Sequence, residues 1–438
     1  MDNQNPTLPV HVLVYGPEDR PPLGAALLVA GQQVAAMVVG VVTPALILSG
    51  VLKFSQADTA YLVSMALMAA AVGTFLQTRR VGPIGSGLLS VTGTSFAFLQ
   101  PLIGAGLAGA PVQIVLAPFM PRLRRLFPPL VSGIVVLLIG LSIIPEAMKE
   151  IVAPMAPGAS ALSGSAVAMV VIGTVLLTQA IGVVWARLTG ILFGVVAGYA
   201  VCAACGWLHA PPAADAWITV PRILPHGFAF RGDLLAPFAF IYLISLLESL
   251  GDMTATAQLS GLRAYGPEHS ARLRGGLLAD GLTSMIAALF GSFPSTTYAQ
   301  NNGVIQITGV ASRHVGKWMA LMLALLGLFP AVAHWVTAMP SAVLGGMALL
   351  LFGLVSVSGL RLIVGSHLSH RDGLIVALAV GVGLGAPSQA EWLARLPGFV
   401  RGLLDSGVSA GGITAIVLNL LLPGGQRAVD ERAPLPGA

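Results

Sequence analysis

The chain has 438 residues, of which 56% are hydrophobic and only 9% are charged. A soluble domain averages about 25% charged residues, and no soluble fold of this length could bury so much apolar surface. The apolar runs are roughly 17–25 residues long, which is the length at which a helix crosses a bilayer. The sequence therefore predicts an all-α polytopic membrane protein. The polar stretch 1–20 lacks the apolar core of a signal peptide.

The net charge of +5 does not indicate a nucleic-acid partner, because the cations stand in short clusters between apolar runs. Such clusters are typical of the cytoplasmic loops of membrane proteins. Their pattern predicts a multi-pass protein of the cell inner (plasma) membrane with both termini in the cytoplasm. The clusters are Arg79 and Arg80, then Arg122, Arg124 and Arg125, then Arg263, Arg272 and Arg274, and finally Arg313 and Lys317.

Fourteen apolar segments follow one another along the chain, and we expect them to be the membrane segments. The fourth has only about 15 residues, roughly 22 Å of helix, which is less than the ~30 Å of a hydrocarbon core. The segments lie near residues 24–49, 58–77, 84–106, 107–121, 129–147, 165–185, 189–208, 234–260, 272–291, 293–312, 316–336, 341–364, 372–387 and 405–422.

The third and tenth segments are interrupted in the same way. Residues 88–96 (LLSVTGTSF) and 292–301 (SFPSTTYAQN) are small, hydroxylated and β-branched, and each precedes a short apolar run. Each pattern predicts an extended stretch that leads into a half-length helix. Paired broken segments in the two halves of a transporter mark a binding site near the membrane midplane. The third and tenth segments are seven segments apart, and because seven is odd, the two halves are predicted to have inverted orientations in the membrane.

Three carboxylates lie inside apolar segments: Glu248, Asp252 and Asp280. Each costs at least ~2.5–3.5 kcal/mol at membrane depth, so a function is expected of them. Glu248 and Asp252 are four residues apart and share a helix face. The structural alternative is an ion pair or a hydrogen bond between helices. We expect the carboxylates, with the amides of Gln300 and Asn301, to hold a small polar ligand and to couple it to protons.

Residues 300–309 (QNNGVIQITG) fit a signature of the nucleobase–ascorbate transporter family. That signature has Gln, Glu or Pro, then Asn, any residue, Gly, four residues of any kind, Thr, and Arg, Lys or Gly. ESLGD lies upstream of it and TSFAF lies in the first half of the chain. From about Pro21 to Leu422 the chain resembles this family.

The resemblance implies two inverted sets of seven segments, a core (substrate-binding) domain and a gate domain, and a homodimer. On that basis residues 1–20 and 423–438 are tails. The core comprises residues 21–125 and 234–336, and the gate and dimerisation domain comprises residues 126–233 and 337–422.

The resemblance also implies roles for particular residues. Glu248 and Gln300 would bind the substrate, while Asp252 and Asp280 would take part with Glu248 in proton coupling. Gln33 stands where the family often has a His, and would give polar support. The remaining residues around the ligand would be Asn301, Phe96, Tyr298, Ala299, Thr94 and Ser95.

The predicted function is proton-coupled symport of an oxidised purine, xanthine or uric acid, with no cofactor or metal and with H⁺ rather than Na⁺ as the coupling ion. In the family, uracil permeases tend to carry Glu where this chain has Gln300. An amide both donates and accepts hydrogen bonds, so it can pair with the adjacent C=O and N–H of an oxidised purine. The alternatives are a uracil or other nucleobase permease, a sulfate or bicarbonate transporter of the same architecture, and an intramembrane aspartyl protease. The protease would need a Gly-x-Gly-Asp motif, but Ser249 stands before Leu250-Gly251-Asp252.

Overall fold

The structure is a computed structural model. It describes residues 13–98, 128–156, 159–160, 162–181, 186, 189–208, 217–225, 235–263, 266–298, 300–364, 368–404 and 406–422. The predicted fourth segment (107–121) and the predicted C-terminal tail (423–438) lie outside these residues.

Helices make up most of the described residues. By length and composition, six described stretches could cross a membrane: α1, α2, α7, α15, residues 130–152 of α6 and residues 370–388. The predicted segment 316–336 is divided in two, because the chain turns at Phe329 before Pro330. The α-helices are α1 (Leu23–Leu52), α2 (Gln56–Arg79), α6 (Pro129–Val152), α7 (Ser163–Ala180), α9 (Gly190–Ala204), α10 (Leu235–Leu259), α11 (Gly266–Leu289), α12 (Gln300–Thr308), α13 (Gly316–Leu328), α14 (Pro330–Thr337), α15 (Ser341–Val364), α16 (His370–Gly385), α17 (Ala390–Leu393), α18 (Gly398–Leu404) and α19 (Gly407–Leu421). The 3₁₀ helices are η1 (Phe96–Phe98), η4 (Arg313–Val315) and η5 (Ala386–Ser388).

The two predicted extended stretches are present as short buried strands, β1 (Thr92–Thr94) and β2 (Ser295–Thr297). They pair antiparallel, with Thr92 opposite Thr297 and Thr94 opposite Ser295. β1 leads into η1, and β2 leads into the nine-residue helix α12. Both predicted breaks therefore meet at one place in the fold.

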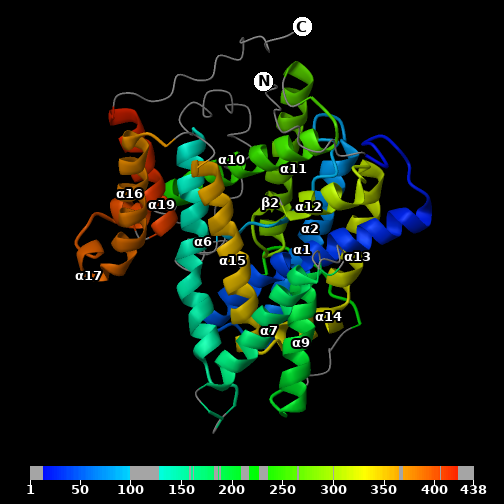
Figure 1. The fold of residues 1–438 in the computed structure, drawn as a ribbon, viewed down its shortest axis with the longest axis horizontal. Helices are drawn as coiled ribbons and strands as arrows, with labels where there is room; N and C mark the ends of the chain where they lie inside the picture. The colour runs from blue at the N-terminus through cyan, green and yellow to red at the C-terminus, as the bar shows by residue number, and fades with distance from the viewer. Residues whose placement is uncertain are drawn as a thin grey trace, which may run out of the picture.

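The helices pack in two groups (Figure 1). α2 is the centre of the first group and packs against α1, α11, α13 and α14, with β1 beside it. In the second group α15 lies along α6, α7 packs against both α15 and α9, and α16 and α19 pack together beside α6. The strand pair belongs to the first group, since it contacts α1, α2, α10 and α11.

The last part of the predicted N-terminal tail is packed against the first group rather than projecting from it. The backbone N–H of Val14 donates to Gly309 O at 2.8 Å, and that of Ala311 donates to Tyr15 O at 2.9 Å. The Ser312 hydroxyl donates to Asp19 O at 2.5 Å. The chain before α1 thus fixes the turn that follows α12.

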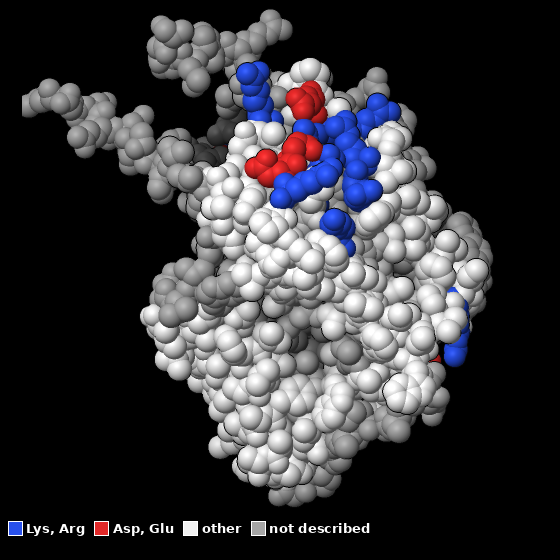
Figure 2. Space-filling view, turned by 90° about the vertical axis from the view of Figure 1, so that its right-hand side faces the viewer, with Lys and Arg blue, Asp and Glu red and all other residues white. Residues whose placement is uncertain are grey.

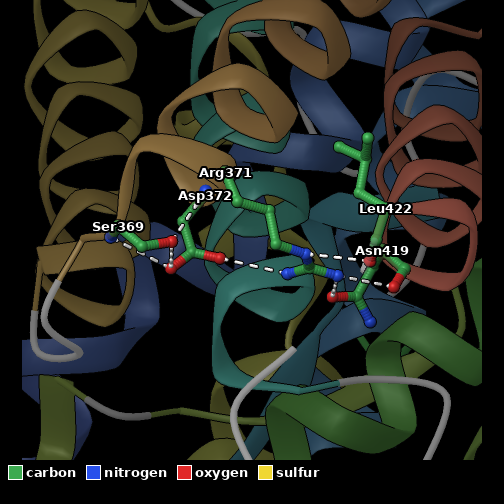
Figure 3. Close-up of polar contacts among 5 residues, drawn as sticks. All are labelled: Ser369, Arg371, Asp372, Asn419 and Leu422. Carbon is green, nitrogen blue, oxygen red and sulfur yellow. Dashed lines mark hydrogen bonds and ion pairs between the residues drawn. The ribbon is translucent and has the colours of Figure 1, made fainter. Parts of the chain in front are cut away.

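In the second group Arg371 joins the start of α16 to the end of α19 (Figure 3). Its guanidinium donates to the backbone oxygens of Asn419 (2.6 Å), in the last turn of α19, and of Leu422 (3.1 Å), the residue that caps it. Asp372 accepts from Arg371 at 3.2 Å and forms a capping box with Ser369. Arg371 thus donates to carbonyl groups at the end of α19, and the capping box satisfies N–H groups at the start of α16. Helix ends leave such groups without partners of their own.

Candidate substrate site

The strand pair places non-helical backbone inside an apolar bundle, where every free N–H and C=O needs a partner. Hydroxyls from neighbouring helices supply several of these partners. Thr74 of α2 accepts from the Thr92 N–H at 3.2 Å, and Ser284 of α11 accepts from the Ser295 N–H at 2.9 Å. The backbone N–H of Tyr298 donates to Val91 O at 2.9 Å, which continues the ladder. The strands are therefore held rigidly where α12 begins.

Gln33 and Asn301 are in direct contact, as an amide pair from α1 and α12. Asn301 Nδ2 donates to Gln33 Oε1 at 2.5 Å and to the Gln33 backbone oxygen at 3.0 Å. Both side chains are buried. Gln33 Nε2 and Asn301 Oδ1 have no hydrogen-bond partner among the described residues. One buried donor and one buried acceptor thus remain available on a fixed amide pair.

An aromatic group lies between the broken segments and α15. The rings of Phe96 and Tyr298 are stacked, with centroids 6.3 Å apart and planes 11° from parallel. Phe352 of α15 packs edge-on against Phe96 at 5.0 Å. The Tyr298 hydroxyl donates to Thr94 O at 2.9 Å, and its ring lies so close to Gly93 that a Cβ there would be 2.5 Å from it. Ring and strand thereby fix each other.

Asp280 of α11 is buried, and both of its carboxylate oxygens have partners. Oδ1 accepts from Gln77 Nε2 of α2 at 2.9 Å, and Oδ2 accepts from the Ser249 hydroxyl of α10 at 2.6 Å. Ser249 also contacts the Thr296 hydroxyl of β2 at 3.1 Å. Asp280 therefore links three helices to the strand pair, which is the structural alternative weighed for it from the sequence.

Glu248 and Asp252, both on α10, are only partly buried. Asp252 accepts from the Thr297 hydroxyl at 3.3 Å. No described side chain forms a hydrogen bond or ion pair with the Glu248 carboxylate, which lies within electrostatic range of Asp280 and Tyr298. Of the three membrane-depth carboxylates, Glu248 is the one for which neither oxygen has a hydrogen-bond partner among the described residues.

Other predicted residues are placed as follows. The Thr94 hydroxyl donates to Val41 O at 2.9 Å, so it is turned toward α1, while Ser95 Oγ is buried without a partner among the described residues. Gln300 begins α12, but its side chain and the whole of Ala299 lie outside the described part of the structure. The described residues contain no cluster of side chains suited to a metal ion.

Four residues of the site were missed in the sequence. Gln77 and Ser249 had a usable signal, since each is a polar residue in an apolar segment close to a charge. Thr297 lies in the predicted stretch 292–301 but was not singled out. Phe352 had no signal, because a Phe in an apolar helix is expected anyway.

Comparison with known proteins agrees with this architecture. The model of a permease family, described as "Permease family", matches residues 24–391. The xanthine permease XanQ of Escherichia coli (strain K12) is 40% identical over 451 residues, covering 97% of this chain and 96% of the relative. The xanthine permease XanP of the same organism is 41% identical, covering 94% and 95%. A putative purine permease of Clostridium perfringens is 33% identical, covering 94% and 93%.

The chain is therefore an integral membrane permease and not an enzyme, which rules out the protease hypothesis. It belongs to the nucleobase–ascorbate transporter family, as the residues of its signature predicted.

Solved structures show the same fold at much lower identity. The transmembrane domain of the cyanobacterial bicarbonate transporter BicA matches with a TM-score of 0.54 at 13% identity, covering 91% of this chain and 99% of that one. The murine anion transporter Slc26a9, in its inward-facing state, matches with a TM-score of 0.59 at 13% identity, covering 92% and 69%. The architecture is thus shared with anion transporters, while the family assignment depends on the closer relatives.

Proposed function

We propose that this permease moves xanthine, or the closely related uric acid, into the cell together with protons. The observation that carries the proposal is the match, at 40% identity and over 97% of the chain, to a xanthine permease. The site supports it, because it offers flat aromatic surface and buried, unused hydrogen-bonding atoms. A planar oxidised purine needs both.

Each part of the site complements a feature of the base. Gln33 Nε2 and Asn301 Oδ1 form a donor and acceptor set, which suits the alternating N–H and C=O groups around an oxidised purine. Phe96 and Tyr298 offer flat aromatic surface against which a planar base would pack. Glu248 accepts from a ring N–H and is the group that binds and releases the coupled proton.

Gln300 supports a purine rather than uracil. A carboxylate at this position would only accept hydrogen bonds and would repel urate, which is largely anionic at neutral pH. We expect Gln300→Glu to weaken purine binding and to admit uracil. The measurement is how strongly unlabelled purine and unlabelled uracil each compete with a labelled base for the variant. Unchanged purine preference would contradict the role given to Gln300.

Transport requires the site to face each side of the membrane in turn. In our proposal the first helix group, with the strand pair, is the core domain, and it moves against a gate domain built on α6 and α15. The antiparallel pairing of β1 with β2 supports inverted halves, since strands related by such a repeat run in opposite directions. The protein works as a homodimer in the inner membrane, with both termini in the cytoplasm.

The deciding experiment is uptake of labelled xanthine, urate and uracil by cells that lack their own permeases, with and without a protonophore. We expect protonophore-sensitive uptake of xanthine or urate and none of uracil. Uptake of uracil alone would favour the uracil alternative. Uptake of sulfate or bicarbonate, with no nucleobase, would favour the anion-transporter alternative.

Glu248→Gln should abolish concentrative uptake, because the amide keeps the shape of the side chain but cannot carry the proton. The matched control is Glu391→Gln, at an exposed residue of α17. Uptake is measured after equal membrane expression has been verified by immunoblot. Wild-type accumulation by the Glu248→Gln variant would refute the coupling role.

A further inference from the structure

Basic side chains gather at one end of the first helix group (Figure 2). They come from four segments that are distant in sequence: the stretch before α1, the end of α2, the α10–α11 connection with the first half of α11, and η4 with the start of α13. We call this set the basic patch; its described cations are Arg20, Arg79, Arg80, Arg263, Arg272, Arg274, Arg313 and Lys317. In the same segments the described carboxylates are Glu18, Asp19 and Glu268 alone, so cations are in clear excess.

Two arginines of the patch have defined side-chain positions, because each forms an ion pair. Arg272 Nη2 lies 2.8 Å from Glu268 Oε1, and Arg313 Nη2 lies 2.5 Å from Glu18 Oε2. The Arg272 side chain is only 13% exposed, whereas Glu268 is 76% exposed. The first pair lies within α11, and the second connects η4 to the stretch before α1, so it holds two segments of the patch together.

Several cations in the patch are not neutralised. Arg79, Arg274 and Lys317 are exposed, and no described carboxylate pairs with any of them. Arg80 and Arg263 also lie within electrostatic range of Glu268, which already has Arg272 as its partner. The pKa of His314 is lowered by partial burial and by the nearby Arg20, Arg313 and Lys317. The positive side chains of the patch thus disfavour a further positive charge on this imidazole.

Aromatic contacts indicate the depth of the patch in the membrane. The Arg79 guanidinium lies 5.8 Å from the ring of Phe75, and Phe75 is 41% exposed on the outer side of α2. Lys317 Nζ lies 5.1 Å from the ring of Trp318. A cation against a lipid-facing aromatic ring is typical of the headgroup level of a bilayer. A patch that projected into the cytoplasm would not need these rings.

The other end of the same helices differs in character. The segment 217–225 is bonded there to the ends of α11 and α13 through Leu289 O and Leu328 O. It exposes the apolar side chains Trp217 (92%) and Ile223 (74%). The described cations at this end are Lys53 and Arg222, against eight in the basic patch, so positive charge is concentrated at one end of the first helix group.

From these observations we propose that the basic patch binds the headgroups of anionic phospholipids in the inner leaflet. Charge complementarity supports this partner, since polybasic segments next to membrane helices attract anionic lipid by about 1 kcal/mol for each cation. The aromatic contacts favour a lipid headgroup over a soluble anion. Binding would tether the moving part of the transporter to one lipid surface and so connect its position to the composition of the membrane.

The test compares purified wild-type protein with the triple variant Arg79→Gln/Arg274→Gln/Lys317→Gln. These side chains are exposed, and the substrate site does not use them. The control variant removes the same charge from the other end and the second helix group, as Lys53→Gln/Lys149→Gln/Arg395→Gln. Thermal unfolding in detergent is measured with added phosphatidylglycerol or phosphatidylcholine, a readout that does not depend on transport.

We expect phosphatidylglycerol, but not phosphatidylcholine, to raise the unfolding temperature of the wild type and the control. Each cation is expected to strengthen lipid binding about fivefold. The loss of three cations should therefore weaken the binding of phosphatidylglycerol roughly a hundredfold. Equal effects of both lipids, or full phosphatidylglycerol selectivity in the triple variant, would overturn the proposal. The same shift produced by soluble glycerol phosphate would also overturn it, because the ligand would then be a free anion.

Should the triple variant fail to fold, a salt titration of the wild type provides the decision. At about 0.1 M salt the Debye length is about 10 Å, and exposed charges farther apart than this are largely screened from each other. The shift caused by phosphatidylglycerol should therefore shrink as salt is added. A shift that salt leaves unchanged would count against headgroup binding.

Discussion

Asp280 stands between two buried donors, Gln77 Nε2 and the Ser249 hydroxyl. We predict that Asp280→Ala lowers the free energy of unfolding by about 1–3 kcal/mol, because it leaves buried polar groups without an acceptor. Asp280→Asn keeps one acceptor oxygen, and Ser249 can donate or accept, so its loss should be smaller. Thermal unfolding in detergent measures both. Equal losses for Ala and Asn would show that the hydrogen bonds are not what Asp280 contributes.

Gln33 and Asn301 hold each other in place, so in the proposed site they would meet a ligand as a pair. We predict that Gln33→Ala and Asn301→Ala each weaken xanthine binding, and that the double variant is weaker by less than the sum. Residues in direct contact typically couple by about 0.5–3 kcal/mol. Equilibrium binding of labelled xanthine to the wild type and the three variants gives the coupling. Strict additivity would mean that the two amides meet the substrate independently, or not at all.

At the scale of the elements, the packing of β1 against Tyr298 makes one glycine indispensable. An added Cβ at Gly93 would lie 2.5 Å from the Tyr298 ring, so Gly93→Ala must displace either the ring or the strand. Overpacking of this kind costs about 1–3 kcal/mol. We predict lower stability and weaker substrate binding, because Tyr298 stacks on Phe96. The control is Gly173→Ala in α7, where an added Cβ meets nothing within 4 Å.

The contact between α16 and α19 can be tested in the same way, at a distance from the substrate site (Figure 3). Arg371→Gln loses its charged hydrogen bonds to Asn419 O and Leu422 O. Hydrogen bonds to charged groups contribute about 1.5–3 kcal/mol, so the unfolding temperature should fall while the affinity for xanthine stays the same. Arg395→Gln, at an exposed side chain, should change neither quantity. A selective loss of xanthine binding by the Arg371 variant would contradict a purely structural role.

For the whole molecule, the sequence predicted best the features that depend on local composition. The breaks at residues 88–96 and 292–301 were predictable, because small and β-branched residues interrupt an apolar run in both places. The helix bounds followed the apolar runs in most segments. Pro330 divided a run that hydrophobicity alone joined, although its effect on a helix is known.

The partners of the polar side chains could not be predicted, since they depend on how distant helices meet. Asp280 was recognised as a membrane-depth carboxylate, yet its partner Gln77 is 203 positions away in the chain. Likewise Phe352 reaches Phe96 only because α15 packs near the broken segments. A single sequence shows which side chains are unusual, but tertiary packing decides which of them remain available to a ligand.

The pairing of β1 with β2 also has a consequence for biosynthesis. Tyr298 and its acceptor Thr94 are 204 positions apart, so the first strand leaves the ribosome long before its partner exists. Until then the N–H and C=O groups of β1 that pair with β2 lack those partners, and the bilayer offers no replacement. The first half of the chain must therefore wait in an unfinished state, in which the membrane insertion machinery or other proteins can shield it. The candidate site can therefore form only after α12 has been synthesised, and a chain that stops before Gln300 lacks half of it.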